Sequence, residues 1–237
     1  NLLGALTLAG QYEIPEVGLF FGHSLLRGNR TQKMDASGFD AFASGNCPPL
    51  ATVGTEIEVH WERILPPPTG PFRVHTRMGR NVAALRIYPG ITAELLTNFL
   101  RPPLEGLVLE TYGSGNAPDR RADFLEALRA GTASGIVVVN CTQCHRGAVN
   151  TAYAAGAALA EAGVVGGADM TSEAALTKLA FLLGQGLAPD EVKRLVATDL
   201  RGELTEPETR FTHRDRELVR MLAQYLGNMK VPLAGGS

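Results

Sequence analysis

Apolar residues recur along this chain in short runs, and the spacing within each run predicts a helix or a strand. Leu2 to Ala9 have the spacing of a helix, and residues 16–21 read as a strand. Residues 56–61 alternate polar with apolar side chains, as in a strand with one buried face. The run Pro66-Pro67-Pro68-Thr69-Gly70-Pro71 fits neither a helix interior nor a central strand. We therefore expect a domain boundary between about residues 64 and 80.

Strands and helices alternate beyond this boundary. Strands are predicted at residues 82–88, 104–111 and 136–140, and helices at 91–100, 119–130, 152–163, 174–183, 191–198 and 213–226. The Ile-Val-Val-Val run that begins at Ile136 implies a strand buried on both faces. Thr92 and Pro189 lie at predicted helix starts, and Gly131 is expected to stop the helix before it. This alternation predicts parallel β/α layers with right-handed crossovers.

The predicted fold class is therefore α/β, with parallel β/α layers in two lobes. Residues 1–64 are assigned to the first lobe, 65–80 to the connection, 81–206 to a smaller α/β lobe, and 207–237 to a charged C-terminal helix and tail. The first helix is already under way at Asn1, which is not a methionine. We therefore expect the chain to be a fragment of a longer polypeptide.

Composition excludes several classes of partner. The chain has 237 residues and a formal net charge of -2, so it has no basic footprint for nucleic acid or for a membrane surface. No apolar run approaches the ~18 residues that span a bilayer, and no cleavable leader is recognised at the start. Its 3 cysteines do not make a disulfide framework. These features favour a cytoplasmic protein.

Lys33 is the first candidate for chemistry. The sequence Arg-Gly-Asn-Arg-Thr-Gln-Lys at 27–33 follows the apolar run 17–21, which places Lys33 in a loop beyond a strand, where α/β proteins present reactive groups. Only 4 of the 22 basic residues are lysines, so lysine is not the default surface cation here. Phe39 and Phe42 indicate that the loop is packed down. An ammonium close to other cations or partly desolvated can lose its proton and activate a hydroxyl nucleophile.

The most conspicuous motif is Cys141-Thr142-Gln143-Cys144-His145, which matches haem attachment and, in part, redox and zinc patterns. Its context argues against all three, because it ends a buried parallel strand and because Cys47 lacks a nearby partner in sequence. We expect neither a metal nor a cofactor.

Two further residues have a structural and a functional interpretation. Asn116 lies in the glycine-containing loop 112–118 between a strand and a helix, which is either a plain turn or a ligand loop. The loop lacks the third glycine of a dinucleotide fingerprint. The side-chain amide of Asn116 can both donate hydrogen bonds to a small polar substrate and accept them from it. Tyr153, among alanines, is either a packing residue or a hydroxyl that lines a pocket.

Seven segments together resemble the cytoplasmic type I L-asparaginases, and the mammalian branch most. They are R-G-N-R-T-Q-K, F-D-A-F-A-S, Y-P-G-I, Y-G-S-G-N-A-P, I-V-V-V-N-C-T-Q-C, G-G-A-D-M-T-S-E-A-A-L-T-K-L and D-L-R-G-E-L-T. The resemblance covers roughly residues 1–206. It implies the remainder of an N-terminal asparaginase domain followed by a smaller Rossmann-like domain. In the mammalian branch the asparaginase domain precedes ankyrin repeats and has also been described as a lysophospholipase.

The family resemblance implies a mechanism and a substrate, L-asparagine. A threonine nucleophile attacks the side-chain amide, supported by a triad of a second threonine, an aspartate and a lysine. Both threonine motifs are expected before Asn1, and Lys33 matches the triad lysine. Asn116 matches an asparagine that reaches a neighbouring subunit's active site, and Tyr153 matches an active-site tyrosine of the mammalian branch. The resemblance implies a homotetramer built as a dimer of intimate dimers.

The bacterial relatives also bind asparagine at an allosteric site near the counterparts of Gln32, Glu110 and Cys144. Gln32 replaces the usual threonine, and Glu110 stands where an arginine can occur. Losing a cation that pairs with an effector's carboxylate argues against allostery. Two alternative functions stay open beside the amidohydrolase: a lysophospholipase-type ester hydrolase and a catalytically silent α/β scaffold lobe.

Overall fold

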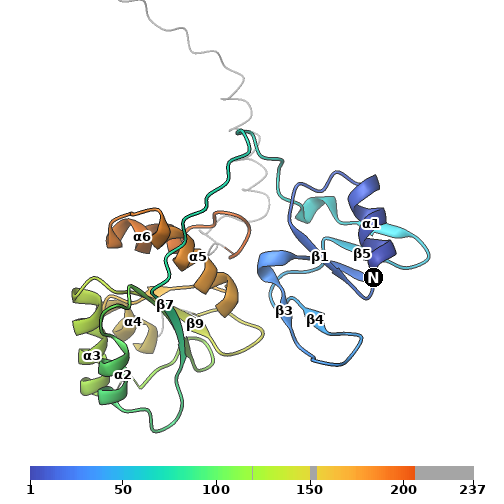
Figure 1. Ribbon diagram of the computed structural model, residues 1–237. Helices are drawn as coiled ribbons and strands as arrows, with labels where there is room; N and C mark the ends of the chain where they lie inside the picture. Colours follow the sequence, from blue (N-terminus) through green and yellow to red (C-terminus); the bar gives the residue numbers. More distant parts are fainter. Residues whose placement is uncertain (119, 150–153, 206–237) are drawn as a thin grey trace, which may run out of the picture. The chain divides into compact units, whose positions relative to one another are not determined.

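The computed structural model describes residues 1–118, 120–149 and 154–205 (Figure 1). Residues 1–205 form one compact unit, whose fold is described below. The predicted α/β class is confirmed, with a sheet in each of two lobes. The predicted helix at 213–226 lies outside the described residues. Among the described helices, none combines the length and the apolar character that crossing a bilayer requires.

The first lobe contains helix α1 (Leu2–Gln11) and an antiparallel sheet. The strands are β1 (Gly18–Phe21), β2 (Ser24–Arg27), β5 (Ala51–Val53) and β6 (Ile57–Val59), in the order β1-β2-β5-β6. The expectation of parallel strands in this lobe is wrong, because β1 turns directly into β2 through two residues. Only antiparallel neighbours can be joined so tightly, and Gly22, with φ 61°, supplies the left-handed turn conformation.

A short two-stranded sheet carries the lysine loop. Its strands are β3 (Gln32–Lys33) and β4 (Phe42–Ala43), preceded by a 3-10 turn, η1 (Gly28–Arg30). The strands are antiparallel, with Lys33 opposite Phe42. A second 3-10 turn, η2 (Trp61–Arg63), ends the lobe before the proline-rich connection.

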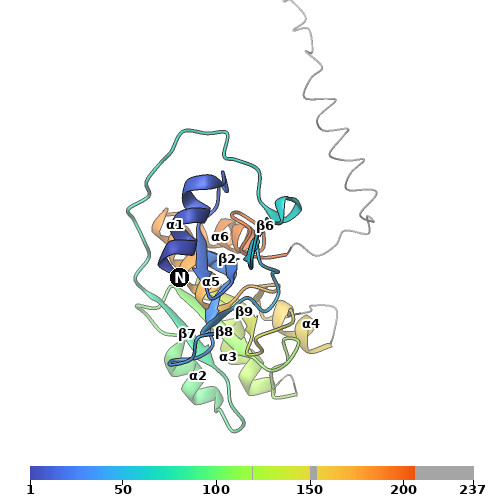
Figure 2. The same ribbon diagram turned by 90° about the vertical axis from the view of Figure 1, so that its right-hand side faces the viewer.

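The second lobe has the predicted parallel β/α layering. Its sheet, in the order β10-β9-β8-β7, consists of β7 (Val82–Arg86), β8 (Gly106–Thr111), β9 (Val137–Thr142) and β10 (Val165–Gly166). The helices are α2 (Ala93–Phe99), α3 (Ala122–Ala133), α4 (Ala154–Glu161), α5 (Ser172–Gly184) and α6 (Pro189–Val196). Figures 1 and 2 show helices on both sides of this sheet.

Period-2 alternation explains the unbroken apolar runs of the central strands. In β9, Val138 packs into the core that α2 and α3 cover, whereas Val137 and Val139 pack into the core that α5 and α6 cover. All three side chains are fully buried. Burial on both faces was the expectation for this strand, and it is confirmed.

Two predicted helix-start signals are confirmed, and one predicted helix end is not. Thr92 accepts a hydrogen bond from the Leu95 amide, and Pro189 is in the first turn of α6, as predicted. The expectation that Gly131 stops α3 is wrong, because the helix continues to Ala133. A Cβ at Gly131 would lie 2.9 Å from Leu100, so this glycine permits close helix packing. The left-handed residue is instead Gly135, with φ 100°.

Candidate functional site

A cavity of about 510 Å³ lies where the lysine loop faces the carboxyl ends of the parallel strands. Lys33, Gln32, Glu110 and Cys144, four of the residues singled out from the sequence, line it together. Arg86 and Glu173 add further charge to the wall, and the His145 ring also lines it. Both signs of charge therefore border one space, which suits a small polar or zwitterionic molecule.

Gln32 is held at both ends of its amide. Its Nε2 donates to Glu173 Oε2 at 3.1 Å, and its Oε1 is 3.0 Å from His145 Nδ1. With the Gln32 amide in this orientation, its Oε1 accepts and His145 Nδ1 donates in this contact. Gln32 thereby links β3 to the loop after β9 and to the first turn of α5.

Glu110 is neutralised by a neighbour on the next strand. Arg86 and Glu110 are register partners on β7 and β8, and Arg86 Nε lies 2.9 Å from Glu110 Oε2. Arg86 Nη2 also donates to the carbonyl oxygen of Gln143 at 3.3 Å. The Arg86 guanidinium in this wall is thus paired with the Glu110 carboxylate.

Lys33 is exposed at the cavity, and its Nζ lies 4.7 Å from the centroid of the Phe42 ring. Phe42 in turn packs edge-on against Phe21, with centroids 5.1 Å apart. The expectation that the loop is packed down holds for Phe42, but Phe39 is 92% exposed. An aromatic ring therefore supports the ammonium from one side and leaves it accessible.

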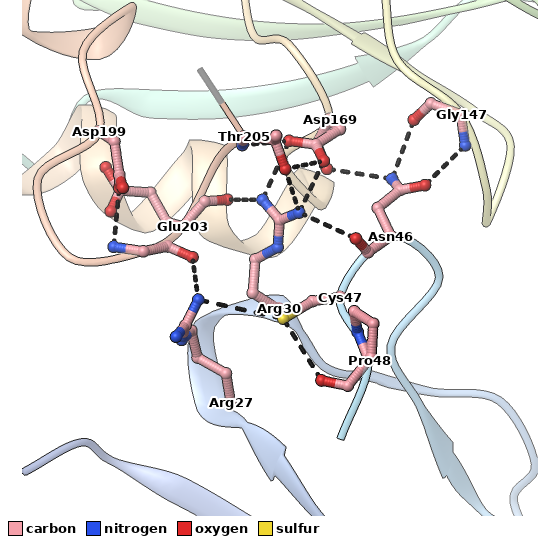
Figure 3. Close-up of polar contacts among 11 residues, drawn as sticks. Arg27, Arg30, Asn46, Cys47, Pro48, Gly147, Asp169, Asp199, Glu203 and Thr205 are labelled. Atoms are coloured by element: carbon pink, nitrogen blue, oxygen red, sulfur yellow. Dashed lines mark hydrogen bonds and ion pairs between the residues drawn. The ribbon is translucent and has the colours of Figure 1, made fainter. Parts of the chain in front are cut away.

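A buried charge cluster anchors the start of the lysine loop (Figure 3). The Arg30 side chain is 4% exposed and binds Asp169 through both terminal nitrogens, at 3.0 and 2.6 Å. It also donates to the Glu203 carbonyl oxygen at 2.8 Å and to the Thr205 hydroxyl at 3.1 Å. Every strong donor of the guanidinium end thus has an acceptor, as a buried charge requires.

Burial alone would raise the pKa of Asp169, but the hydrogen bonds that its carboxylate accepts lower the pKa by more. The Arg30 guanidinium and the backbone amide and hydroxyl of Thr205 stabilise the carboxylate and hold its pKa below the ordinary value. Asp169 therefore stays ionised at neutral pH.

Asn46 makes a second connection between the lobes. Its Nδ2 donates to the Gly147 carbonyl oxygen at 2.9 Å, and its Oδ1 accepts from the Gly147 amide at 2.8 Å. The adjacent Gly45 runs so close to the next loop that a Cβ would collide with the His145 carbonyl oxygen. These contacts and the Arg30 cluster fix both loops of the first lobe at the cavity.

Lys178 contrasts with Lys33. It is 7% exposed, forms an ion pair with Glu203 at 2.6 Å, and donates to the Val196 and Thr198 carbonyl oxygens at 2.9 and 2.5 Å. Burial favours a higher pKa for Glu203, but the bond from Lys178 outweighs it and the pKa is lowered. These bonds attach α5, which carries Lys178, to the chain that follows α6, so we assign Lys178 a structural role.

The other sequence candidates lie apart from the cavity or outside the described residues. Asn116 is exposed and does not line the cavity; its loop is closed by backbone hydrogen bonds with Tyr112. Tyr153 lies outside the described residues. Cys141 is buried, which raises the pKa of its thiol to about 12, and Cys144 is exposed. Within the described ranges, no group of three or more His, Cys, Asp or Glu residues is placed to hold a metal ion.

Comparison with known families accounts for both lobes. The family described as "Asparaginase, N-terminal" matches residues 1–65, and "Glutaminase/Asparaginase C-terminal domain" matches residues 81–196. The chain belongs to the asparaginase/glutaminase family. The members of this family that it matches include a 60 kDa lysophospholipase of Mus musculus, 54% identical over 211 residues, and L-asparaginase 1 of Escherichia coli K12, 50% identical over 210 residues.

The chain spans 37% of the length of the mouse protein and 61% of the E. coli protein, which match 88% and 86% of this chain. Among solved structures, L-asparaginase I from Vibrio cholerae O1 superposes with a TM-score of 0.81 at 45% identity. That match covers 86% of this chain and 62% of the Vibrio chain. The family resemblance identified from the motifs is thereby confirmed.

Arg30, Asn46 and Asp169 were not singled out from the sequence. Two of them lie within motifs that carried the resemblance, R-G-N-R-T-Q-K and G-G-A-D-M-T-S-E. Only the folded chain brings Arg30 to Asp169, which is 139 positions away.

Proposed function

We propose that this chain is the part of an L-asparaginase that supplies the lysine of the catalytic triad, in an enzyme that hydrolyses L-asparagine to L-aspartate and ammonia. Family membership through both lobes carries the proposal, together with 50% identity to a protein named L-asparaginase 1. An exposed lysine on a fixed loop, at a cavity with both signs of charge, is consistent with an amino acid substrate.

The proposed chemistry uses a threonine nucleophile outside these 237 residues. Its hydroxyl oxygen bonds to the amide carbon, the C–N bond breaks, and ammonia leaves with the proton from the hydroxyl. Water then cleaves the aspartyl ester and returns the threonine hydroxyl. Lys33 assists through the second threonine of the triad, whose proton it helps to accept and return.

The rigid support of the Lys33 loop favours this role. Arg30, three residues earlier, is fixed by Asp169, while Gln32 is fixed by His145 and Glu173. Preorganised placement of a catalytic group lowers the entropy that must be lost in the transition state. These contacts fix the backbone on the N-terminal side of Lys33.

Further elements of the proposal come from the resemblance. Asn116 contacts the substrate of a neighbouring subunit, which fits its exposure and the fact that it does not line the cavity of its own chain. Tyr153 contributes to substrate binding. The enzyme is a cytoplasmic homotetramer built from intimate dimers.

Coupled detection of ammonia tests the activity on the gene product that carries these residues. Asparagine is expected to release ammonia, and absence of release at every enzyme concentration would refute the amidohydrolase. Lys33→Met is expected to lower kcat by at least about 100-fold, on the scale of losing acid-base assistance. Lys193→Met is the matched control, because Lys193 lies on α6 and makes an i,i+3 pair with Asp190. Equal kcat for wild type and Lys33→Met would remove Lys33 from the mechanism.

An ester hydrolase is the second candidate, favoured by the name of the mouse relative, 60 kDa lysophospholipase. Its direct test is release of fatty acid from lysophosphatidylcholine by the same preparation. If Lys33→Met abolishes ammonia release and leaves fatty acid release intact, the two activities use different groups.

The cavity also supports a regulatory proposal. Gln32, Glu110 and Cys144 come from three separate segments and line part of the cavity that Lys33 also borders. Arg86 already forms an ion pair with Glu110, so we expect a carboxylate effector to bind weakly to this guanidinium. Glu110→Gln frees Arg86 and should increase sigmoidicity of the asparagine saturation curve. An unchanged curve in this variant would argue against an effector role.

A further inference from the structure

The connection between the two lobes is a long exposed segment. Every residue from 66 to 78 is exposed, and none belongs to a helix or a strand. Figures 1 and 2 show this stretch as a loop that runs outside both lobes. Within the described ranges, residues 66–74 form no hydrogen bond with the rest of the chain. A partner protein can therefore reach this part of the connection along its whole length.

Both ends of this exposed stretch are attached to the folded lobes. Before it, the Leu65 amide donates to Glu16 Oε1 at 2.7 Å. After it, His75 Nδ1 lies 3.2 Å from Gln185 Oε1. The free span is thus restricted to residues 66–74 and is held at each end. A span held in this way loses less conformational entropy on binding than an untethered tail loses.

The free span contains a Pro-x-x-Pro-x-Arg sequence, formed by Pro68, Pro71 and Arg73. Each proline ring fixes φ near the value of a polyproline II helix, and residues that precede a proline favour the same conformation. This helix has about three residues per turn, so Pro68 and Pro71 lie on one edge when the segment adopts it. Aromatic-lined grooves, such as those of SH3 domains, bind an edge of this kind.

The charge of the connection suits an acidic partner. No acidic residue occurs between Glu62 and Glu94, whereas that stretch contains Arg63, Arg73, Arg77, Arg80 and Arg86. Within the described residues, none of the ion pairs includes Arg73. A polyproline II helix rises about 3.1 Å per residue, which places Arg73 about 6 Å beyond Pro71. A carboxylate beside the groove can bind this guanidinium through two parallel hydrogen bonds.

A spacing role alone does not account for the composition of the connection. Proline by itself makes a linker stiff. The free span also carries Phe72 and Val74, which are 93% and 70% exposed, and the chain bends at Gly70. Apolar side chains next to the Pro-x-x-Pro-x-Arg sequence add contact area for a partner.

We propose that residues 66–74 are a docking site for an SH3 domain whose aromatic-lined groove has an acidic pocket at one end. Pro68 and Pro71 enter the groove, and Arg73 pairs with the acidic pocket. None of these three residues lines the cavity that Lys33 borders. The docking site is therefore independent of the proposed hydrolase activity, and it gives the connection a binding partner of defined chemistry.

The test titrates two purified SH3 domains with the full-length gene product that carries these residues. The first probe is an SH3 domain that selects ligands with arginine after the second proline, and calorimetry should show that it binds. The second probe is an SH3 domain that selects arginine three residues before the first proline. It should not bind, because a Pro-x-x-Pro sequence preceded by Arg63 would need a proline where the chain has Thr69. An isotope-labelled first probe should show chemical shift changes at the aromatic residues of its groove.

Substitutions in the connection identify the docking site. Pro68→Ala with Pro71→Ala should weaken binding of the first probe at least about tenfold, because both groove contacts are lost. Pro66→Ala is the matched control, since this proline precedes the Pro-x-x-Pro-x-Arg sequence. Arg73→Glu should also weaken binding at least about tenfold, whereas Arg77→Glu, an exposed arginine outside the sequence, should change it little. Equal thermal melting of all variants confirms that each is folded.

Gly70→Pro tests the bound conformation in the opposite direction. Proline at this position restricts the free span to the conformation that the groove binds, so the affinity should increase by about two- to fivefold. The substitution fits the structure, because nothing lies within 4 Å of a Cβ added at Gly70. Weaker binding by this variant would contradict binding as a polyproline II helix.

Each outcome supports or overturns the docking site. Absence of binding by the first probe, or binding that Pro68→Ala with Pro71→Ala leaves unchanged, would overturn it. Equal losses in Arg73→Glu and Arg77→Glu would show a general attraction between charges and would overturn the assigned arginine contact. Preference for the second probe would overturn the assigned direction of the ligand. Ammonia release measured on the same variants should equal that of wild type, so failure of the docking site is distinguishable from failure of the proposed activity.

Discussion

Arg30 and Asp169, 139 positions apart in sequence, form a buried ion pair in which each terminal guanidinium nitrogen contacts its own carboxylate oxygen, at 3.0 and 2.6 Å. Arg30 belongs to the first lobe and Asp169 to the segment that leads into α5. The pair therefore couples the loop that carries Lys33 to the second lobe, and its integrity should govern both stability and loop position.

Removing one partner of this pair should be costly. Arg30→Ala or Asp169→Ala is expected to lower the free energy of unfolding by about 3–5 kcal/mol, because an unpaired charge remains buried. Urea unfolding of the 237-residue chain measures the change. Arg194→Ala is the control, since its pair with Glu191 is exposed to solvent and should contribute little to the free energy of unfolding.

A double-mutant cycle distinguishes pairing from packing. In Arg30→Met with Asp169→Leu no buried charge is left, so the double variant should lose less stability than the two single variants added together. Additive losses would mean that the two side chains act independently, contrary to the geometry.

The same pair makes stability depend on pH. The folded pKa of Asp169 is lowered, so its contribution is fully present above the unfolded pKa of about 3.9 and is lost as pH falls through the folded pKa. Asp169→Asn should therefore reduce the fall in unfolding free energy between pH 5 and the acid limit of folding. Urea titrations across that interval measure the slope, and an unchanged slope in Asp169→Asn would contradict the assignment.

The second lobe was predictable because its strands are buried on both faces. Such strands give unbroken apolar runs, as in Val137 to Val139, and helices of regular period fall between them. Among the short, half-buried strands, β1 and β6 were predicted, whereas β3 and β5, of two and three residues, give no comparable signal. Gly131 misled the prediction of a helix end because packing against Leu100, and not backbone conformation, accounts for that glycine.

The candidate site was predictable only in part. Lys33 was singled out from its loop and from the rarity of lysine, and Gln32, Glu110 and Cys144 from the family resemblance. Their meeting at one cavity depends on three segments that the sequence does not relate to one another. Arg30 carried no signal of its own. An arginine in a polar loop is expected to be exposed, and nothing in the local sequence indicates that this one is only 4% exposed. Long-range pairing is a property of the fold, and local pattern does not encode it.

Gly45 should be intolerant of any side chain. A Cβ there would collide with the backbone oxygen of His145, which cannot rotate away. Gly45→Ala is expected to lower the free energy of unfolding by about 1–3 kcal/mol, as for other overpacked positions. Gly10→Ala is the control, because nothing lies within 4 Å of the added Cβ, and alanine favours its helix. Equal unfolding midpoints for the two variants would disprove the close approach of these loops.

The three cysteines should react in the order of their environments. Cys144 is exposed, Cys47 is half-buried, and Cys141 is buried with its thiol pKa raised to about 12. Since the thiolate is the reactive form, a thiol of pKa about 12 is ionised to only about one part in ten thousand at pH 8, and burial slows it further. Labelling with a disulfide reagent at pH 8 should therefore show a fast phase from Cys144, a slower one from Cys47, and Cys141 only after addition of denaturant. Cys144→Ser should remove the fast phase, and persistence of that phase in this variant would contradict its assignment to Cys144.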